Sequence, residues 1–251
     1  MIKFFRKIRQ NLISEGKTLS YLKYAIGEIV LVMIGILLAL QVNNWNENRK
    51  DNIREVTNLK NLKSELEISL EELKSDYNST KIFHNSALKI QNWIRKKTPI
   101  SDSMYRDFFL SYQFTHFFPK TSTYETFKNG NLELIQSDSL KILITDIYEA
   151  GYKRILLKTN TPKNTAMHLF YQDNFRITSD VKSRANDNLA EIKYSYKAIP
   201  NDYESLIKNP KYESIISEAI MDRKIQIRDF EFTLGLVQKG INQIDAYLKT
   251  K

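Results

Sequence analysis

The clearest hydrophobic pattern along the chain is one long apolar run near its start. The residues from Tyr24 to Trp45 are mostly aliphatic, and Glu28 is the one charged residue among them. As a helix, this run would rise roughly 31 Å at about 1.5 Å per residue, which matches a hydrocarbon core of about 30 Å. The pattern therefore predicts a transmembrane helix over residues 24–45.

Aromatic residues stand at both ends of this predicted helix. Tyr21 and Tyr24 lie at its start and Trp45 closes it, and we expect all three to be interfacial anchors in contact with the lipid bilayer. The uncharged part from Ile29 to Val42 is short enough to suit a signal peptide as well. However, the basic region before it is long and no small-x-small cleavage site follows, which favours an uncleaved anchor.

The distribution of basic residues predicts an orientation. Residues 1–24 contain six lysine or arginine residues and one acid, whereas only Arg49, Lys50 and Arg54 follow closely after the span. The positive-inside rule then places a basic tail over residues 1–23 in the cytoplasm, and an extracytoplasmic domain over residues 46–251 in the periplasm of a bacterium. The tail itself could be an amphipathic helix in the membrane surface or a disordered segment.

The carboxylate within the apolar run has three possible roles. On a helix, Glu28 shares a face with Val32, Gly35 and Ala39, and a small-x3-small pair such as Gly35 and Ala39 lets two helices approach closely. Glu28 could reach back to the lipid headgroups, take part in a helix–helix contact on this face, or serve an ion-coupled complex. We predict these four residues as a transmembrane helix-contact face.

Helical periodicity dominates the remainder of the chain. A heptad pattern follows the span, and a second periodic run extends from Asn209-Pro210 to the C-terminus over roughly 60 Å. The first pattern indicates either a coiled-coil-like seam or an amphipathic helix packed on its own domain. The sequence predicts an all-α fold, in which the transmembrane helix is followed by an elongated helical bundle with long antiparallel helices. The heptad residues are Val56, Leu59, Leu66, Leu70, Leu73 and Tyr77, and Lys63 interrupts them.

Between these two long helices the pattern predicts shorter elements. Ser101-Asp102 and Ser137-Asp138 are typical helix N-caps, the first opening a helix through Phe114. Asn129-Gly130 predicts a turn or helix stop, and the aromatic residues of 104–118 are typical of a core wall. Residues 178–200 are an exception, because Ile192, Tyr194, Tyr196 and Ala198 alternate with polar residues as in a strand, although no partner strand is evident.

No catalytic, cofactor-binding or metal-binding motif is present. The chain has no cysteine, and His84, His116 and His168 are far apart in sequence. More than half of the net charge of +9 lies in residues 1–24, where it suits lipid headgroups better than nucleic acid. We therefore expect no catalytic residue, no cofactor, no metal, no nucleic-acid partner and no enzymatic activity.

Three stretches carry a resemblance to a known family. The opening MIKFFRKIRQNLISEGKTLSYLKYAIGEIVLVMIGILLALQVNNWNE resembles the start of a large bacterial family of single-pass membrane proteins, described only as a domain of unknown function. The later YETFKNGNLELIQSDSLKILITDIYE is similar to its middle segment, and LIKNPKYESII to the start of its closing helix. The resemblance implies a membrane-anchored protein of about this size, with no assigned functional residue, and it fits a scaffold or sensor.

The sequence thus favours a membrane-anchored, non-enzymatic interaction or scaffold protein. Its expected partners are the lipid bilayer and a second copy of itself, through the transmembrane helix and the heptad helix. The alternative is a single-pass accessory subunit of an ion-driven or transport complex, with a membrane protein as partner and Glu28 as the membrane acid.

Overall fold

The structure is a computed structural model that describes residues 18–159, 162–179 and 196–251. Within these ranges it does not describe the side chains of residues 18–21, 24, 131, 158–159 and 162–165. The chain divides into two compact units, Met1–Glu55 and Val56–Lys251. Of the predicted basic tail, residues 1–23, the part over residues 1–17 lies outside the described residues.

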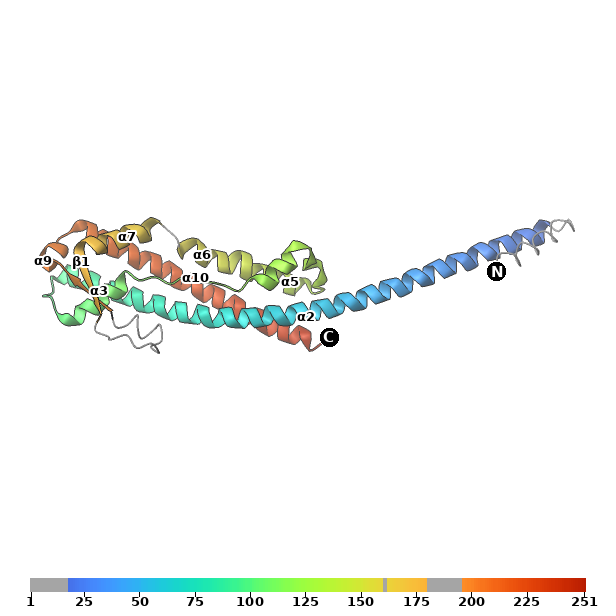
Figure 1. Ribbon diagram of the computed structural model, residues 1–251, viewed down its shortest axis with the longest axis horizontal. Helices are drawn as coiled ribbons and strands as arrows, with labels where there is room; N and C mark the ends of the chain where they lie inside the picture. The colour runs from blue at the N-terminus through green and yellow to red at the C-terminus, as the bar shows by residue number, and fades with distance from the viewer. Residues whose placement is uncertain (1–17, 160–161, 180–195) are drawn as a thin grey trace. The chain divides into compact units, whose positions relative to one another are not determined.

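The first described element is the long helix α2, Thr18–Lys96 (Figure 1). It is uninterrupted because no glycine or proline occurs between Gly35 and Pro99, and these two residues are the strongest helix breakers. The helix ends where Lys97 adopts a left-handed conformation with φ of 50° and the Thr98 amide bonds back to the Trp93 carbonyl. The basic residues and the proline of Lys96-Lys97-Thr98-Pro99 predict a helix stop here, and the structure confirms it.

Short elements connect the two long helices, and their caps match the predictions. The Ser101 and Ser137 side chains accept hydrogen bonds from the amides of Ser103 and Leu140, and Gly130 has a φ of 126° at the predicted turn. The elements are the 3-10 turns η1 (Asp102–Met104) and η3 (Leu132–Leu134), the π-type turns η2 (Phe127–Asn131) and η4 (Asp146–Tyr152), and helices α3 (Tyr105–Ser111), α4 (Ser122–Thr126), α5 (Asp138–Thr145), α6 (Lys153–Thr159) and α7 (Pro162–Asn174).

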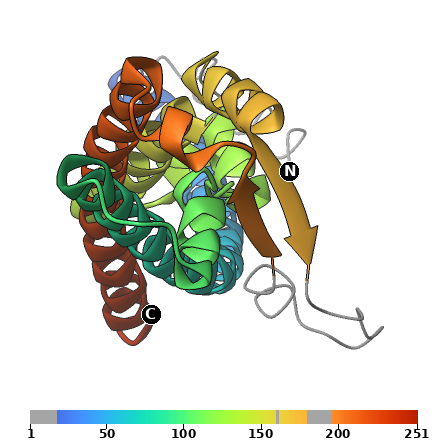
Figure 2. The same cartoon turned by 90° about the vertical axis from the view of Figure 1, so that its left-hand side faces the viewer.

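A two-stranded antiparallel hairpin departs from the all-α prediction. Strand β1, Phe175–Ser179, pairs with β2, Tyr196–Pro200, and both lie to one side of the helices in Figure 2. The predicted strand is thus confirmed at Tyr196 and Ala198, and β1 supplies the partner that the sequence did not reveal. Ile192 and Tyr194 lie outside the described residues. The rest of the described chain is mostly helical, as predicted.

Helix α9, Tyr203–Leu206, leads into α10, Pro210–Leu248, which runs antiparallel to the part of α2 within the same unit (Figure 1). Asn209 caps α10 by accepting from the Lys211 amide, with proline in the first turn. The antiparallel prediction is confirmed by three side-chain pairs between the two helices. From one pair to the next, the α2 residue is 14 positions later in the sequence and the α10 residue is 14 positions earlier. The pairs are Lys63 with Asp245, Tyr77 with Glu231 and Gln91 with Ser217.

The buried side chains of α2 follow a heptad, and they form the core of their own unit. Buried positions alternate at steps of three and four residues, apart from one step of seven between Leu73 and Thr80, and this is the spacing of a helical seam. Of the two structures that the heptad allowed, the helix packed on its own domain is the one observed. Lys63 lies beside this seam and pairs with Asp245 at 2.6 Å. The buried seam residues include Leu59, Leu62, Leu66, Ser69, Leu73, Thr80, Phe83, Ala87, Ile90 and Ile94.

The core of this unit has two clusters of buried side chains. One joins the first seam residues of α2 to η4 and the C-terminal half of α10, and the other joins the end of α2 to α3, α7, the hairpin and the start of α10. Helix α10 comes close to η4 at two glycines. A Cβ on Gly151 would lie 3.1 Å from the Thr233 methyl group, and one on Gly240 would lie 2.6 Å from the end of the Ile147 side chain.

Candidate functional site

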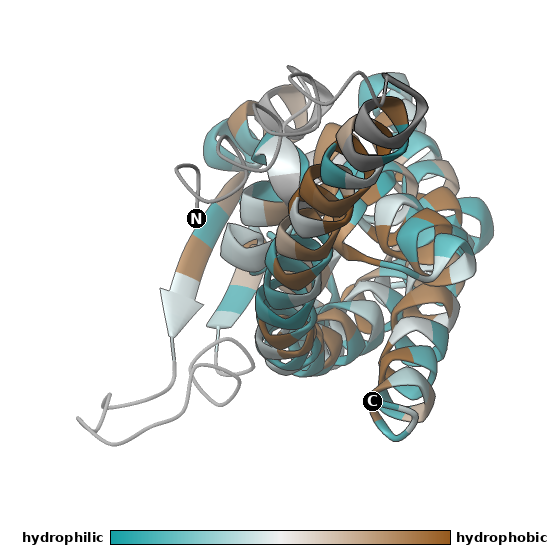
Figure 3. Ribbon diagram, turned by 90° about the vertical axis from the view of Figure 1, so that its right-hand side faces the viewer, coloured by the Kyte–Doolittle hydropathy of each residue, from teal (hydrophilic) through white to brown (hydrophobic). Residues whose placement is uncertain are grey.

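The apolar start of α2 is exposed from Ile29 to Val42. It is the one described helix that is long and apolar enough to cross a membrane, with a mean hydropathy of 2.4 in its most apolar window and none of that window buried. Apolar residues dominate this part of α2 in Figure 3. The core helix of a soluble domain can be as apolar, but it is buried. The exposed large residues here include Ile26, Ile29, Val30, Leu31, Val32, Met33, Ile34, Ile36, Leu37, Leu38, Leu40 and Val42.

The predicted contact face lies on this exposed helix. Val32, Gly35 and Ala39 are exposed and Glu28 is half-buried. Among the described residues, nothing lies within 4 Å of where a Cβ on Gly35 would be, so the backbone there is open to close approach. Trp45 is also exposed, whereas the side chains of Tyr21 and Tyr24 lie outside the described residues. The structure therefore puts the four face residues on one helix and places no other described element against Gly35.

The three histidines lie on different elements. His84 is half-buried on α2, and burial lowers its pKa, with the nearby positive charge of Arg223 acting in the same direction. His116 is exposed on the connector after α3, and His168 contacts Gln172 on α7 at 3.2 Å. Across the described ranges, no group of three or more His, Cys, Asp or Glu residues is placed to hold a metal ion.

The connector between α3 and α4, residues 112–121, lies along α2. The α2 side chains of Glu72 and Ser69 accept hydrogen bonds from the amides of Phe118 and Lys120 at 3.0 and 3.1 Å. Glu65 accepts from the Thr123 amide at 3.1 Å, at the start of α4. These three α2 residues lie on one helical face, and together they satisfy backbone donors that the extended connector cannot satisfy itself.

Side chains of the connector alternate between inside and outside. Thr115 and Phe117 are buried, whereas Phe114, His116 and Phe118 lie on the opposite side of the connector, with Phe114 half-buried and the other two exposed. The ring of His116 lies 6.4 Å from that of Phe114 and 6.5 Å from that of Phe118. We call these three residues the aromatic row. Phe118 is 70% exposed, which is unusual for a phenylalanine and makes the row a candidate contact surface.

A buried arginine holds the start of this connector. The Arg223 guanidinium donates to the carbonyl of Phe83 at 3.4 Å, to that of Gln113 at 3.1 Å, and to that of Ser111. The side chain is only 5% exposed, and this burial lowers its pKa to about 10. Arg223 thereby joins α10 to α2 and to the C-terminal end of α3, where helix carbonyls have no partner of their own.

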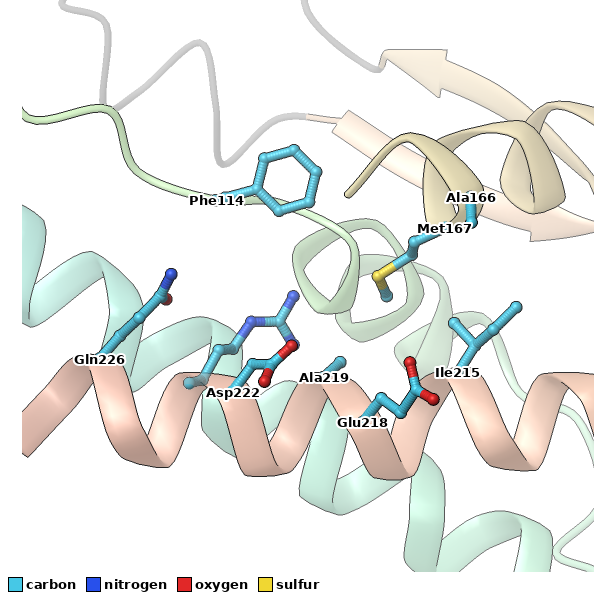
Figure 4. Close-up of a pocket in the computed structure, with 9 residues that line it drawn as sticks. Phe114, Ala166, Met167, Ile215, Glu218, Ala219, Asp222 and Gln226 are labelled. Atoms are coloured by element: carbon cyan, nitrogen blue, oxygen red, sulfur yellow. The ribbon is translucent and has the colours of Figure 1, made fainter. Parts of the chain in front are cut away.

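A cavity of about 110 Å³ lies beside Arg223, between α10, α7 and the connector. Figure 4 shows Phe114 and Met167 facing this space from the connector and α7, opposite α10. Two carboxylates, Glu218 and Asp222, lie one turn apart on α10 and line it together with Ala166, Ile215, Ala219, Arg223 and Gln226. The cavity therefore combines apolar walls with acidic side chains.

A second polar cluster lies at the other end of the unit. Glu149 accepts hydrogen bonds from Lys128 at 2.8 Å, from Tyr124 at 3.1 Å and from Lys153. The hydrogen bonds from Lys128 and Lys153 lower the pKa of Glu149 to about 2. Tyr124 stacks on Tyr148 with 4.1 Å between ring centroids. Each of these polar groups has its partner inside the fold, so the cluster serves to fix η4 against α4.

Sequence reasoning did not identify Arg223 or the cavity. A signal for Arg223 was present, because it occupies a position in the apolar periodicity of the last helix, between Ile216 and Phe230, where a charge is unusual. The cavity had no such signal. Its residues come from three segments separated in the chain, and only the fold brings them together.

Comparison with known families gives a match. A family model described as a family of unknown function (DUF6090) matches residues 28–204, which is well over half of the chain and includes most of the apolar run. No curated protein and no solved structure matches.

Proposed function

This chain belongs to DUF6090, a family of unknown function, and we propose that it is a membrane-anchored, non-enzymatic interaction protein that self-associates through its transmembrane helix. Its N-terminal tail is cytoplasmic and its helical domain lies on the other side of a bacterial inner membrane. The resemblance noted in the opening segment includes the anchor, and the family match over residues 28–204 includes most of it.

One observation carries the proposal, namely the exposed apolar helix. A large aliphatic side chain that stays half exposed to water loses about 1 kcal/mol of the free energy of burial. Covering the apolar residues from Ile26 to Val42 would therefore gain on the order of 10 kcal/mol. A stretch of this length and composition is covered by a lipid bilayer. The helix continues without a break into the domain, which supports an anchor that remains attached.

The face of Glu28, Val32, Gly35 and Ala39 is the proposed contact between two copies. In lipid, small residues allow the close helix packing that drives association, and the open backbone at Gly35 supports this role. The heptad of α2 is no longer a candidate for self-association. Its residues Leu59, Leu66 and Leu73 are fully buried within one chain, so we confine the proposal to the membrane helix.

Substitution of the small residues tests this proposal. In the full chain, purified in mild detergent, Gly35→Leu would hold the two helices apart and reduce the cross-linked dimer severalfold. Gly27→Leu is the matched control, because Gly27 lies about 110° around the helix from the predicted face and should leave the dimer unchanged.

Two results would contradict self-association through this face. One is a monomer in the unsubstituted protein, and the other is equal loss of the dimer in both glycine variants. Co-purification with a multi-pass membrane protein in place of a dimer would instead favour the accessory-subunit alternative, with Glu28 as the membrane acid.

A further inference from the structure

We propose that the aromatic row and the adjoining cavity dock an extended segment of a partner protein, which places a lysine or arginine side chain in the cavity and apolar residues over Phe118. This inference rests on the proposed role as an interaction protein and names the chemistry of the partner. The site lies wholly within the unit Val56–Lys251 and shares no residue with the membrane face.

The first observation is the exposure of the row. Exposed aromatic side chains are enriched at protein contacts, where they supply large, rigid apolar surfaces. Phe118 is 70% exposed and continues through His116 to Phe114, which lines the cavity. The connector is fixed beneath them, since Glu72 and Ser69 bind its backbone amides. The backbone at Phe118 is therefore fixed on α2, which keeps this ring exposed.

The second observation is the charge of the cavity. Arg223 donates to three backbone carbonyls, and Asp222 interacts electrostatically with its guanidinium. Glu218 adds a second, exposed carboxylate, so the lining has one more negative than positive charge. The other ionisable side chains that line the cavity are the carboxylates of Glu218 and Asp222. A basic side chain complements these acids, and Phe114 beside them offers a ring face to a cation.

The third observation is size. Pockets for drug-sized ligands are about 300–1,000 Å³, whereas this cavity is about 110 Å³. It has room for one side chain but not for a whole ligand of that kind. The aromatic row then gives the remainder of the partner segment a surface along which to extend, because Phe114, His116 and Phe118 follow one another at every second residue of the connector.

A peptide-binding assay tests the proposal. The full chain in uncharged detergent is titrated into a short fluorescent peptide in which arginine alternates with leucine, and anisotropy is measured. Saturable binding is expected, and it should weaken as salt is added, because salt screens exposed charges. A peptide in which glutamate alternates with leucine should bind at least about tenfold more weakly.

Substitutions locate the binding. Phe118→Ala, and separately the pair Glu218→Gln with Asp222→Asn, should each weaken binding at least about fivefold, the effect of losing ~1 kcal/mol at an interface. The matched controls are Phe232→Ala and Glu213→Gln, which change exposed residues of α10 outside the site and should have no effect. All these side chains are exposed or half-buried, so the melting temperature should be unchanged.

Three results would overturn the inference: no saturable binding of the arginine peptide, equal binding of the glutamate peptide, or equal weakening by the control substitutions. The dimer assay is run on the same samples. Loss of peptide binding with the dimer intact would remove this site alone, whereas loss of the dimer with peptide binding intact would remove the membrane contact alone.

Discussion

Replacement of Arg223 by methionine should destabilise the domain more than any surface substitution. The methionine keeps much of the apolar length but removes donors to the carbonyls of Ser111, Gln113 and Phe83. The Phe83 carbonyl lies inside α2 and keeps its helical hydrogen bond. The carbonyls of Ser111 and Gln113 lie at or past the end of α3, where no helical donor follows.

The magnitude follows from these contacts. Each buried carbonyl left without a donor costs about 1–3 kcal/mol, so two of them cost roughly 2–6 kcal/mol in the free energy of unfolding. Removing a buried charge relieves part of its desolvation penalty, which reduces the expected loss to about 2–4 kcal/mol. Arg223→Lys keeps the charge, but its single ammonium group cannot reach all three carbonyls, so it should fall between methionine and the natural residue.

Urea unfolding of the full chain in detergent, followed by near-UV circular dichroism, measures this loss. Lys224→Met is the matched control, because Lys224 is the next residue of α10 and its side chain is exposed. It should change the free energy of unfolding by less than about 0.5 kcal/mol. If Arg223→Met were as stable as Lys224→Met, the role assigned to Arg223 in holding α3 and the connector would be wrong.

Three further predictions concern other parts of the chain. Gly151→Leu should cost about 1–3 kcal/mol in thermal unfolding, because even its Cβ would lie 3.1 Å from the Thr233 methyl group and the rest of the side chain would overpack the contact between η4 and α10. An unchanged melting temperature would contradict that packing. Glu149 has a pKa lowered to about 2, so its stabilising effect is complete above its ordinary pKa of about 4.5 and is lost as the pH falls toward 2. Glu149→Gln should therefore be less stable than the natural protein at neutral pH, and the two melting temperatures should converge near pH 2. A difference in melting temperature that stays constant with pH would refute this. Because the chain lacks cysteine, Ser75→Cys should react with a membrane-impermeant maleimide in spheroplasts and Ser14→Cys only after lysis; the opposite pattern would reverse the proposed orientation.

The long helices were predictable because their signals are local. The absence of glycine and proline, the Asn209-Pro210 start and the stop at residues 96–99 act within a few residues, and all three hold in the structure. The heptad also predicted a buried face of the helix. One of its two sets of heptad positions, however, is buried one residue earlier than predicted. Leu62 is in the seam, while Lys63 lies beside it and pairs with Asp245.

The remaining features depend on contacts between distant segments. Strand β2 had a recognisable alternation, but its partner Phe175–Ser179 becomes a strand only through pairing across the hairpin. The helix predicted from Ser101 to Phe114 ends at Ser111, where Arg223 of a distant helix binds the carbonyls of Ser111 and Gln113. Beyond that point the chain lies along Ser69 and Glu72 of α2. The periodicity within one segment cannot predict contacts with segments that are distant in the sequence.

The most direct test of the membrane anchor is whether residues 24–45 stay attached to the domain and remain in the membrane. Trypsin cleaves after Lys23 and next after Arg49, so one peptide, Tyr24 to Arg49, contains the entire apolar run. Membranes from expressing cells are washed at alkaline pH, and the pellet is digested and analysed by mass spectrometry. An anchored protein predicts this peptide in the pellet, in equal amount with peptides from α10. Recovery of the α10 peptides in the wash, or a chain that begins after residue 40, would contradict the membrane anchor.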